Sequence, residues 1–108
     1  MKNAKEPGMT FETIRGDECL TVRICGHLDA RTAPALSDGM SKVLDGVTKI
    51  VFDLSELNYI SSAGMRILLA SFKLMAKREG TMRVENVQPD VMNVLDMSGF
   101  AVLFNIGE

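Results

Sequence analysis

Hydrophobic and polar residues alternate most clearly between Cys19 and Cys25, where every second side chain is aliphatic. An alternation with a period of two places the aliphatic residues on one face of a strand, so this segment is predicted to be half-buried. A weaker alternation over residues 9–15 predicts an earlier strand. The polar residues 16–18 lie between the two segments and favour a hairpin turn. The buried face of the second strand is expected to consist of Leu20, Val22 and Ile24.

Two later segments are also predicted to be strands. Residues 49–54 contain the continuous apolar run Ile50-Val51-Phe52. Such a run is typical of a strand that is covered on both faces, in a parallel sheet with helices on each side. Residues 81–87 predict a further strand. The apolar segment 100–106 predicts either a final short strand or an extended tail.

Between these strands the apolar spacing changes to the i, i+3, i+4 pattern of amphipathic helices. A first helix is predicted over residues 33–44, and either Asp29 or Thr32 can act as its N-cap. The strongest apolar stripe follows a polar turn and extends over residues 65–79. A short third helix is predicted to begin at Pro89, because proline is well tolerated in the first helical turn.

Strands that alternate with helices in this order predict a single α/β domain. Right-handed crossovers between them give a mixed, mostly parallel sheet of four to five strands with helices packed against it. We expect this domain to span residues 9–108 and residues 1–8 to form a flexible leader. In open sheets of this kind, function collects at the carboxyl ends of the strands. The loop 26–29 and the turn 58–64 should therefore lie on the same edge.

Charge and composition argue against several classes of partner. The formal net charge is −2, aromatic residues make up 6% of the chain and tryptophan is absent. Neither nucleic acid nor an anionic membrane is therefore expected as the main partner. The sequence shows neither an apolar run long enough to span a bilayer nor a signal peptide. We expect a cytoplasmic protein that does not insert into membranes.

No set of residues with catalytic spacing stands out. The chain's one histidine, His27, lies near Asp29 and is interpreted as a loop residue rather than a general base. Cys19 and Cys25 are about 20 Å apart if they share one strand, too far for a disulfide or a two-ligand metal site, so both are expected to be reduced. We therefore expect a protein that is not an enzyme and that has no catalytic residue, cofactor or metal.

The turn before the second helix carries two adjacent serines, Ser61 and Ser62. Serine is among the best helix N-caps, and the local pattern by itself favours that role. The free N–H groups and partial positive charge of a helix N-terminus would also stabilise a phosphate added at this point. Phosphorylation would then alter the surface over the turn and leave the fold intact, so the alternative to a cap is a binding switch.

Three segments together resemble a known family. The most specific covers residues 52–66, with Phe52-Asp53-Leu54-Ser55 at its start and Tyr59-Ile60-Ser61-Ser62-Ala63-Gly64-Met65-Arg66 at its end. The other two are Gly26-His27-Leu28-Asp29 and Met97-Ser98-Gly99-Phe100. These segments are similar to the central strand–turn–helix, the loop and the C-terminal part of STAS-domain proteins. The resemblance extends from the first strand to Phe104 and is strongest to the small stand-alone anti-sigma factor antagonists.

The resemblance implies partner switching in the control of bacterial transcription. Such an antagonist binds a serine kinase that also acts as an anti-sigma factor, and this binding frees the sigma factor. The kinase phosphorylates a serine at the start of the central helix, which releases the antagonist, and a serine phosphatase restores it. The matching position is Ser62. Ser61 is the competing site, because many members of the family have an aspartate where this chain has a second serine.

The resemblance also implies a partner-binding surface made of the loop aspartate and the serine turn. The residue after the modified serine is often serine or threonine in the family, and here it is alanine. The alternative function is a non-phosphorylated STAS docking subunit of a transport or signalling assembly. The expected partner-binding residues are Asp29, Ser61, Ser62, Ala63, Gly64, Met65 and Arg66.

Overall fold

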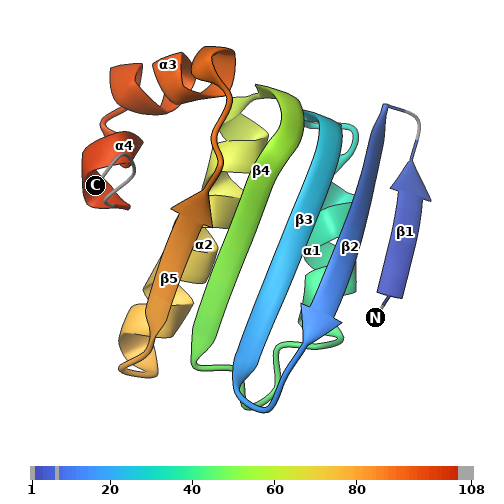
Figure 1. Cartoon of the computed structure of the whole chain (residues 1–108), viewed down its shortest axis with the longest axis vertical. Coiled ribbons are helices and arrows are strands. Elements are labelled where there is room, and N and C mark those ends of the chain that lie inside the picture. The colour runs from blue at the N-terminus through green and yellow to red at the C-terminus, as the bar shows by residue number, and fades with distance from the viewer. Residues whose placement is uncertain (1, 7, 105–108) are drawn as a thin grey trace.

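The computed structural model describes residues 2–6 and 8–104, with the backbone alone for residues 2–6. Its strands form a five-stranded sheet in the order β1-β2-β3-β4-β5 (Figure 1). The first two pairs are antiparallel, and the pairs β3–β4 and β4–β5 are parallel. The predicted α/β fold with a mixed sheet is confirmed, although parallel and antiparallel pairs are equal in number. The strands are β1 (Lys2–Glu6), β2 (Met9–Arg15), β3 (Cys19–Leu28), β4 (Lys49–Ile60) and β5 (Thr81–Glu85).

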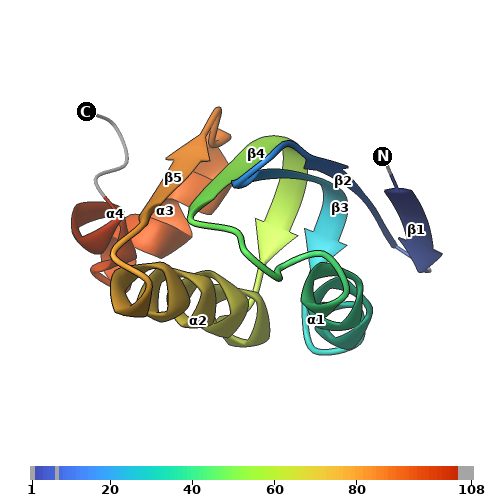
Figure 2. The ribbon, with the colours of Figure 1, turned by 90° about the horizontal axis from the view of Figure 1, so that it is seen from below.

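Two helices form a single layer against one face of the sheet. Figure 2 shows α1 and α2 side by side on this face, with α3 and α4 beside β5. In the described part of the chain no helix covers the opposite face, so the prediction of helices on both sides is wrong. The polar residues of that face explain why. Guanidinium nitrogens of Arg23 lie 3.8 Å from a carboxylate oxygen of Glu12 and 3.4 Å from one of Asp53. Covering these ion pairs with a helix would remove them from water at a large desolvation cost. The helices are α1 (Ala33–Ser41), α2 (Ser62–Lys77), α3 (Pro89–Met97) and α4 (Phe100–Leu103).

The core lies between the sheet and the helix pair. The alternating aliphatic residues of β3 are fully buried, as predicted, and the apolar run of β4 contributes two more buried side chains. Burying one such side chain stabilises the fold by about 1.5–3 kcal/mol. The main buried residues are Leu20, Val22, Ile24, Ile50 and Phe52 from the sheet and Leu36, Met40, Leu68 and Met75 from the helices.

The first residues form a strand and not the predicted flexible leader. Residues 2–6 pair with β2 from Lys2 opposite Thr13 to Glu6 opposite Met9. The outer edge of β2 would otherwise expose a row of unpaired backbone groups, and β1 satisfies them. Residues 1 and 7 of the expected leader lie outside the described residues.

Two strands are longer than the apolar pattern predicted. β3 continues through the expected loop 26–29 as far as Leu28, with register shifts on either side of Gly26. This glycine has a φ of +94°, and a Cβ at its position would collide with the carbonyl oxygen of Gly8. A glycine bulge thus allows the strand to continue where the pattern indicated a break. β4 likewise extends to Ile60, directly before the two serines.

The C-terminal apolar segment is helical, so the predicted strand or extended tail is wrong. Gly99 has a φ of +79° and ends the preceding turn, and α4 then begins at Phe100. The ring of Phe104 lies 5.5 Å from the rings of both Phe72 and Phe100. This aromatic contact with α2 keeps the segment at the edge of the helix layer. Residues 105–108 of the expected domain lie outside the described residues.

Candidate functional site

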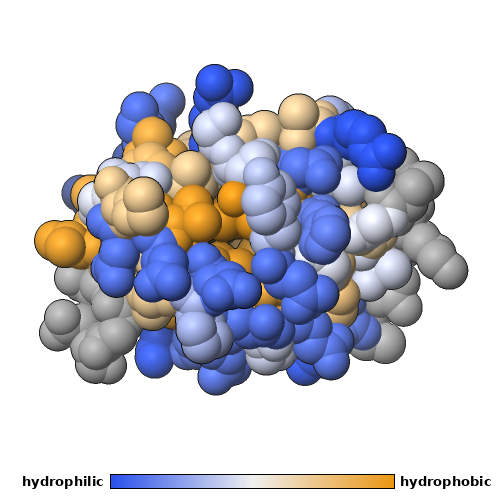
Figure 3. All heavy atoms as spheres, turned by 90° about the horizontal axis from the view of Figure 1, so that it is seen from above, coloured by the Kyte–Doolittle hydropathy of each residue, from blue (hydrophilic) through white to orange (hydrophobic). Residues whose placement is uncertain are grey.

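The carboxyl ends of β3 and β4 meet at one edge of the sheet. Their last paired residues are Leu28 and Ile60, so Asp29 and Ser61 follow immediately from neighbouring strands. The N–H of Ser61 donates a hydrogen bond to the carbonyl oxygen of Leu28 at 2.9 Å. The structure therefore brings the loop aspartate and the serine turn to the same edge. Figure 3 shows this end of the molecule, where an apolar area is surrounded by hydrophilic side chains.

A network of hydrogen bonds closes the turn before α1. The hydroxyl of Thr32 donates to the carbonyl oxygen of His27 and accepts from the N–H of Asp29, both at 2.9 Å. The carboxylate of Asp29 accepts from the N–H groups of Arg31 at 2.9 Å and Thr32 at 3.2 Å. Desolvation would raise the pKa of Asp29, but these hydrogen bonds outweigh it and lower that pKa below its ordinary value. Asp29 thus stabilises the turn, and Thr32 occupies the N-cap position.

The ring of His27 faces an aromatic side chain and not the nearby carboxylate. It meets the ring of Tyr59 edge to face, with 5.8 Å between the ring centres. Tyr59 is 49% exposed, so the pair presents an accessible aromatic surface next to the serine turn. Neither residue is among the predicted partner-binding residues. One feature of β4 points to this surface: the alternation of buried and exposed residues breaks at Asn58 and Tyr59, which are both exposed.

The two serines at the start of α2 have different environments. Ser61 occupies the N-cap position with extended backbone, but neither it nor any other side chain makes a cap hydrogen bond. Its hydroxyl oxygen is buried and has no hydrogen-bond partner among the described residues. Ser62 is the first residue of the helix and is exposed. Neither serine thus acts as the side-chain cap that the local pattern favoured.

Gly64 fixes the position of this helix start. A Cβ at Gly64 would lie 2.7 Å from Cγ of Leu28 and 2.8 Å from Cγ1 of Ile60. These distances are too short for a real Cβ, so the absence of a side chain allows α2 to pack directly against the ends of β3 and β4. The exposed serine is therefore held at the edge by tight packing below it.

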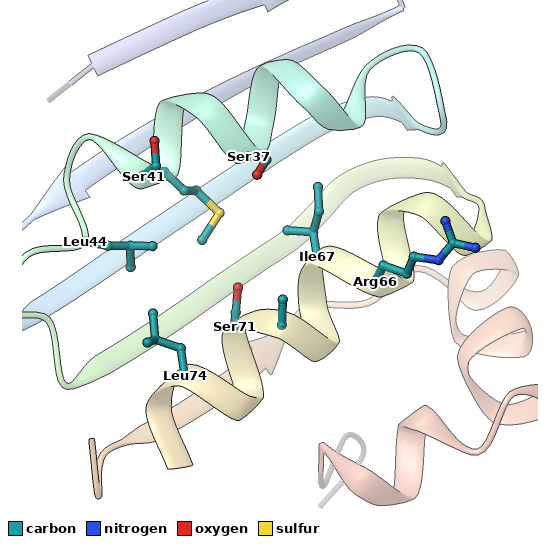
Figure 4. Close-up of a pocket in the computed structure, with 9 residues that line it drawn as sticks. Ser37, Ser41, Leu44, Arg66, Ile67, Ser71 and Leu74 are labelled. Carbon is teal, nitrogen blue, oxygen red and sulfur yellow. The ribbon is translucent and has the colours of Figure 1, made fainter. Parts of the chain in front are cut away.

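The remaining residues of the predicted surface differ in their exposure. Ala63 and Met65 are half-buried, whereas Arg66 is exposed. Arg66 also lines one end of a groove of about 250 Å³ between α1 and α2. Figure 4 shows the hydrophobic side chains of this groove and the Arg66 side chain extending toward the N-terminal end of α2. Ser62 and Arg66 are thus the two predicted residues of α2 that are exposed and can be reached by a partner.

Other kinds of site find little support in the described part of the chain. No group of three or more histidine, cysteine or acidic residues could hold a metal ion there. Cys19 and Cys25 are both free. The thiol of Cys25 donates to the carboxylate of Glu56 at 3.1 Å, and burial together with this bond raises the pKa of the thiol. None of the described helices has the length and apolar character needed to cross a membrane.

Comparison with known proteins gives one family. The family model described as STAS domain matches residues 10–108. The anti-sigma F factor antagonist of Paenibacillus polymyxa is 34% identical over 82 residues, covering 74% of this chain and 70% of that protein.

Two solved structures have a similar fold. One is the unphosphorylated anti-sigma factor antagonist SpoIIAA, with a TM-score of 0.77, 22% identity and coverage of 85% of this chain and 83% of the other. The other is the Bacillus cell fate determinant SpoIIAA in its phosphorylated form, with a TM-score of 0.70, 21% identity and coverage of 85% and 86%.

Proposed function

Because this chain belongs to the STAS domain family, we propose that it is an anti-sigma factor antagonist that acts by partner switching. In this proposal the unmodified chain binds a serine kinase that is also an anti-sigma factor, and the sigma factor is released. Phosphorylation of Ser62 ends the interaction, and a serine phosphatase restores it. The chain itself catalyses no reaction and works in the cytoplasm.

The names of the relatives support the general role. The Paenibacillus polymyxa protein is an anti-sigma F factor antagonist, and it is similar to this chain over most of both sequences. SpoIIAA is also named an anti-sigma factor antagonist, and one of its structures is of a phosphorylated form. The proposed phosphorylated state of this chain corresponds to that form of SpoIIAA.

The contrast between Ser61 and Ser62 carries the choice of modified residue. A kinase must reach the hydroxyl that it phosphorylates, and Ser62 is exposed whereas the hydroxyl oxygen of Ser61 is buried. No side chain caps α2, so the N–H groups of its first turn remain available to phosphate oxygens. A phosphate on Ser62 would add nearly two negative charges at the positive end of the helix.

The effect of this phosphate would fall on the surface over the turn. The buried packing of Gly64 against Leu28 and Ile60 lies below Ser62 and need not change. The added charge would instead meet any protein docked over Ser62 and the exposed pair His27 and Tyr59. Like charges or unpaired charges in a protein interface typically reduce the binding free energy by several kcal/mol, which is roughly enough to release a partner.

The test is phosphorylation by the serine kinase that co-purifies with the unmodified chain from its host. Incubation with this kinase and ATP should raise the intact mass by one phosphate. Ser62→Ala should abolish the increase, and the matched variant Ser61→Ala should retain it. An increase that persists in Ser62→Ala would contradict the assignment. Co-purification of a transport assembly whose binding is unaffected by Ser62→Asp would instead favour the docking-subunit alternative.

A further inference from the structure

Arg66 is placed to interact with whatever group is added to Ser62. The two residues are four positions apart in α2, so they lie on the same face of the helix, about 5–6 Å apart between Cβ atoms. Helical side chains lean toward the N-terminus of their helix, and the long Arg66 side chain extends in that direction (Figure 4). A negative group four residues before a cation is also the more favourable order for such a pair.

Arg66 has no partner of its own in the described part of the chain. Four other arginines do: Arg15 and Arg78 bind backbone carbonyl oxygens, while Arg23 and Arg83 form ion pairs. The guanidinium of Arg66 makes no such hydrogen bond or ion pair and is exposed. Holding it in a new contact would therefore break no existing interaction.

Arg31 is the other arginine near this edge, but it is directed elsewhere. It follows Asp29 in the turn before α1. One of its guanidinium nitrogens lies 3.8 Å from the position that a Cβ on Gly8 would take, at the β1–β2 connection. Arg31 thus provides a matched comparison: the same side chain at the same edge of the sheet, without the helical spacing to Ser62.

We propose that Arg66 is the receiver of the Ser62 phosphate, binding two of its oxygens in cis through the guanidinium. Arginine suits this role because its planar fork can donate two parallel hydrogen bonds to a phosphate. The free N–H groups at the start of α2 can hold the remaining oxygen. This inference deepens the proposed function and rests on it for its biological meaning.

The interaction would make the switch act in two ways at once. In the unmodified chain Arg66 offers a free cation next to the α1–α2 groove, available to a carboxylate of the docked partner. After phosphorylation the surface gains the phosphate charge, and the same arginine is occupied by it. The summed charge of residues 62 and 66 therefore changes from about +1 to between about −0.5 and −1 at neutral pH, since a phosphoserine carries about −1.5 to −2. An acidic partner surface would lose its attraction and meet repulsion.

The test uses the full chain with phosphoserine incorporated at position 62 during translation, so that no kinase is needed. The ³¹P chemical shift of the phosphate is followed against pH at low salt. Because a nearby cation favours the dianion, Arg66→Gln should raise the titration midpoint by about 0.15–0.4 pH unit. Arg66→Lys should give a smaller increase, since lysine retains the charge but not the fork. The increase should shrink in 1 M salt, where the Debye length is about 3 Å.

Arg31→Gln is the control and should move the midpoint by less than about 0.1 pH unit, because its cation is not spaced to reach the phosphate. The proposal is overturned if Arg66→Gln leaves the midpoint unchanged or if Arg31→Gln raises it as much. The outcome is separate from that of the proposed function. A kinase that fails to modify Ser62 would contradict the function alone, whereas an unchanged midpoint would contradict the role of Arg66 alone.

Discussion

The starts of α1 and α2 lie at the same edge of the sheet and are built in different ways. The turn before α1 has its polar groups paired, with Thr32 and Asp29 each making two or more hydrogen bonds. The start of α2 has no side-chain cap, a buried serine hydroxyl without a partner, and an exposed serine. It is held by the backbone bond from Ser61 to Leu28 and by the packing of Gly64.

This difference indicates which helix start is free for function. Hydrogen-bond donors that are already satisfied by side chains cannot bind an incoming group without breaking those bonds. In the turn before α1 the N–H groups of Arg31 and Thr32 are already bonded to the Asp29 carboxylate, whereas the first turn of α2 leaves its donors to solvent or to a ligand. Two neighbouring turns thus have a structural role in one case and the proposed switch role in the other.

The largest stability effect is expected at Thr32. Thr32→Val keeps the shape of the side chain but leaves the carbonyl oxygen of His27 and the N–H of Asp29 without their partner. The free energy of unfolding should fall by about 2 kcal/mol in urea denaturation, because each unsatisfied buried group costs about 1–3 kcal/mol. Thr32→Ser, which retains the hydroxyl, should lose clearly less. Equal losses in the two variants would mean that packing, and not this network, stabilises the turn.

A smaller loss is expected at Gly64. Gly64→Ala should lower the free energy of unfolding by about 1–2 kcal/mol, because the added methyl group collides with Leu28 and Ile60 by more than the better helix propensity recovers. Gly16→Ala is the control, since its nearest contact would be an ordinary 3.7 Å, and it should change stability by less than about 0.5 kcal/mol. If both variants are equally stable, α2 can shift away from the edge at no cost, and the comparison loses its basis.

The smallest effect, and one of opposite sign, is expected at Ser61. Ser61→Ala removes a buried hydroxyl that has no partner in the described part of the chain. Stability should stay the same or rise by up to about 1 kcal/mol, measured as the midpoint of urea denaturation at an unchanged m-value. A loss of more than 1 kcal/mol would show that the hydroxyl is satisfied in solution. The two helix starts would then be alike, contrary to the contrast described above.

Sequence patterns were sufficient for the elements whose residues face one environment. The alternation in β3 and the apolar stripe of α2 predicted both elements, because each element buries one periodic set of apolar residues in the core. The stretch 100–106 and the leader were misassigned, because their structure depends on distant contacts. The helix α4 leads to Phe104, which meets Phe72 of α2, and residues 2–6 pair with an edge that no local pattern reveals.

The site was predictable in position and less so in detail. The loop aspartate and the serine turn share an edge because they follow neighbouring parallel strands, and the order of elements implied this. The division between Ser61 and Ser62 was not predictable from composition, because it depends on which of two adjacent hydroxyls faces the interior. The exposed pair of His27 and Tyr59 was missed for a related reason: their meeting depends on the register shift beside Gly26.

The docking of α2 on the strand ends has a consequence for how its first residue can be recognised. Ser62 has its place only when Ser61 is bonded to Leu28 and Gly64 is packed on the Leu28 side chain, contacts that join segments more than thirty residues apart. An enzyme that acts on Ser62 in this setting reads a three-dimensional epitope and not a linear peptide. In the proposed cycle, nascent or damaged copies that have not completed the domain would lack that epitope, so only folded copies would be phosphorylated.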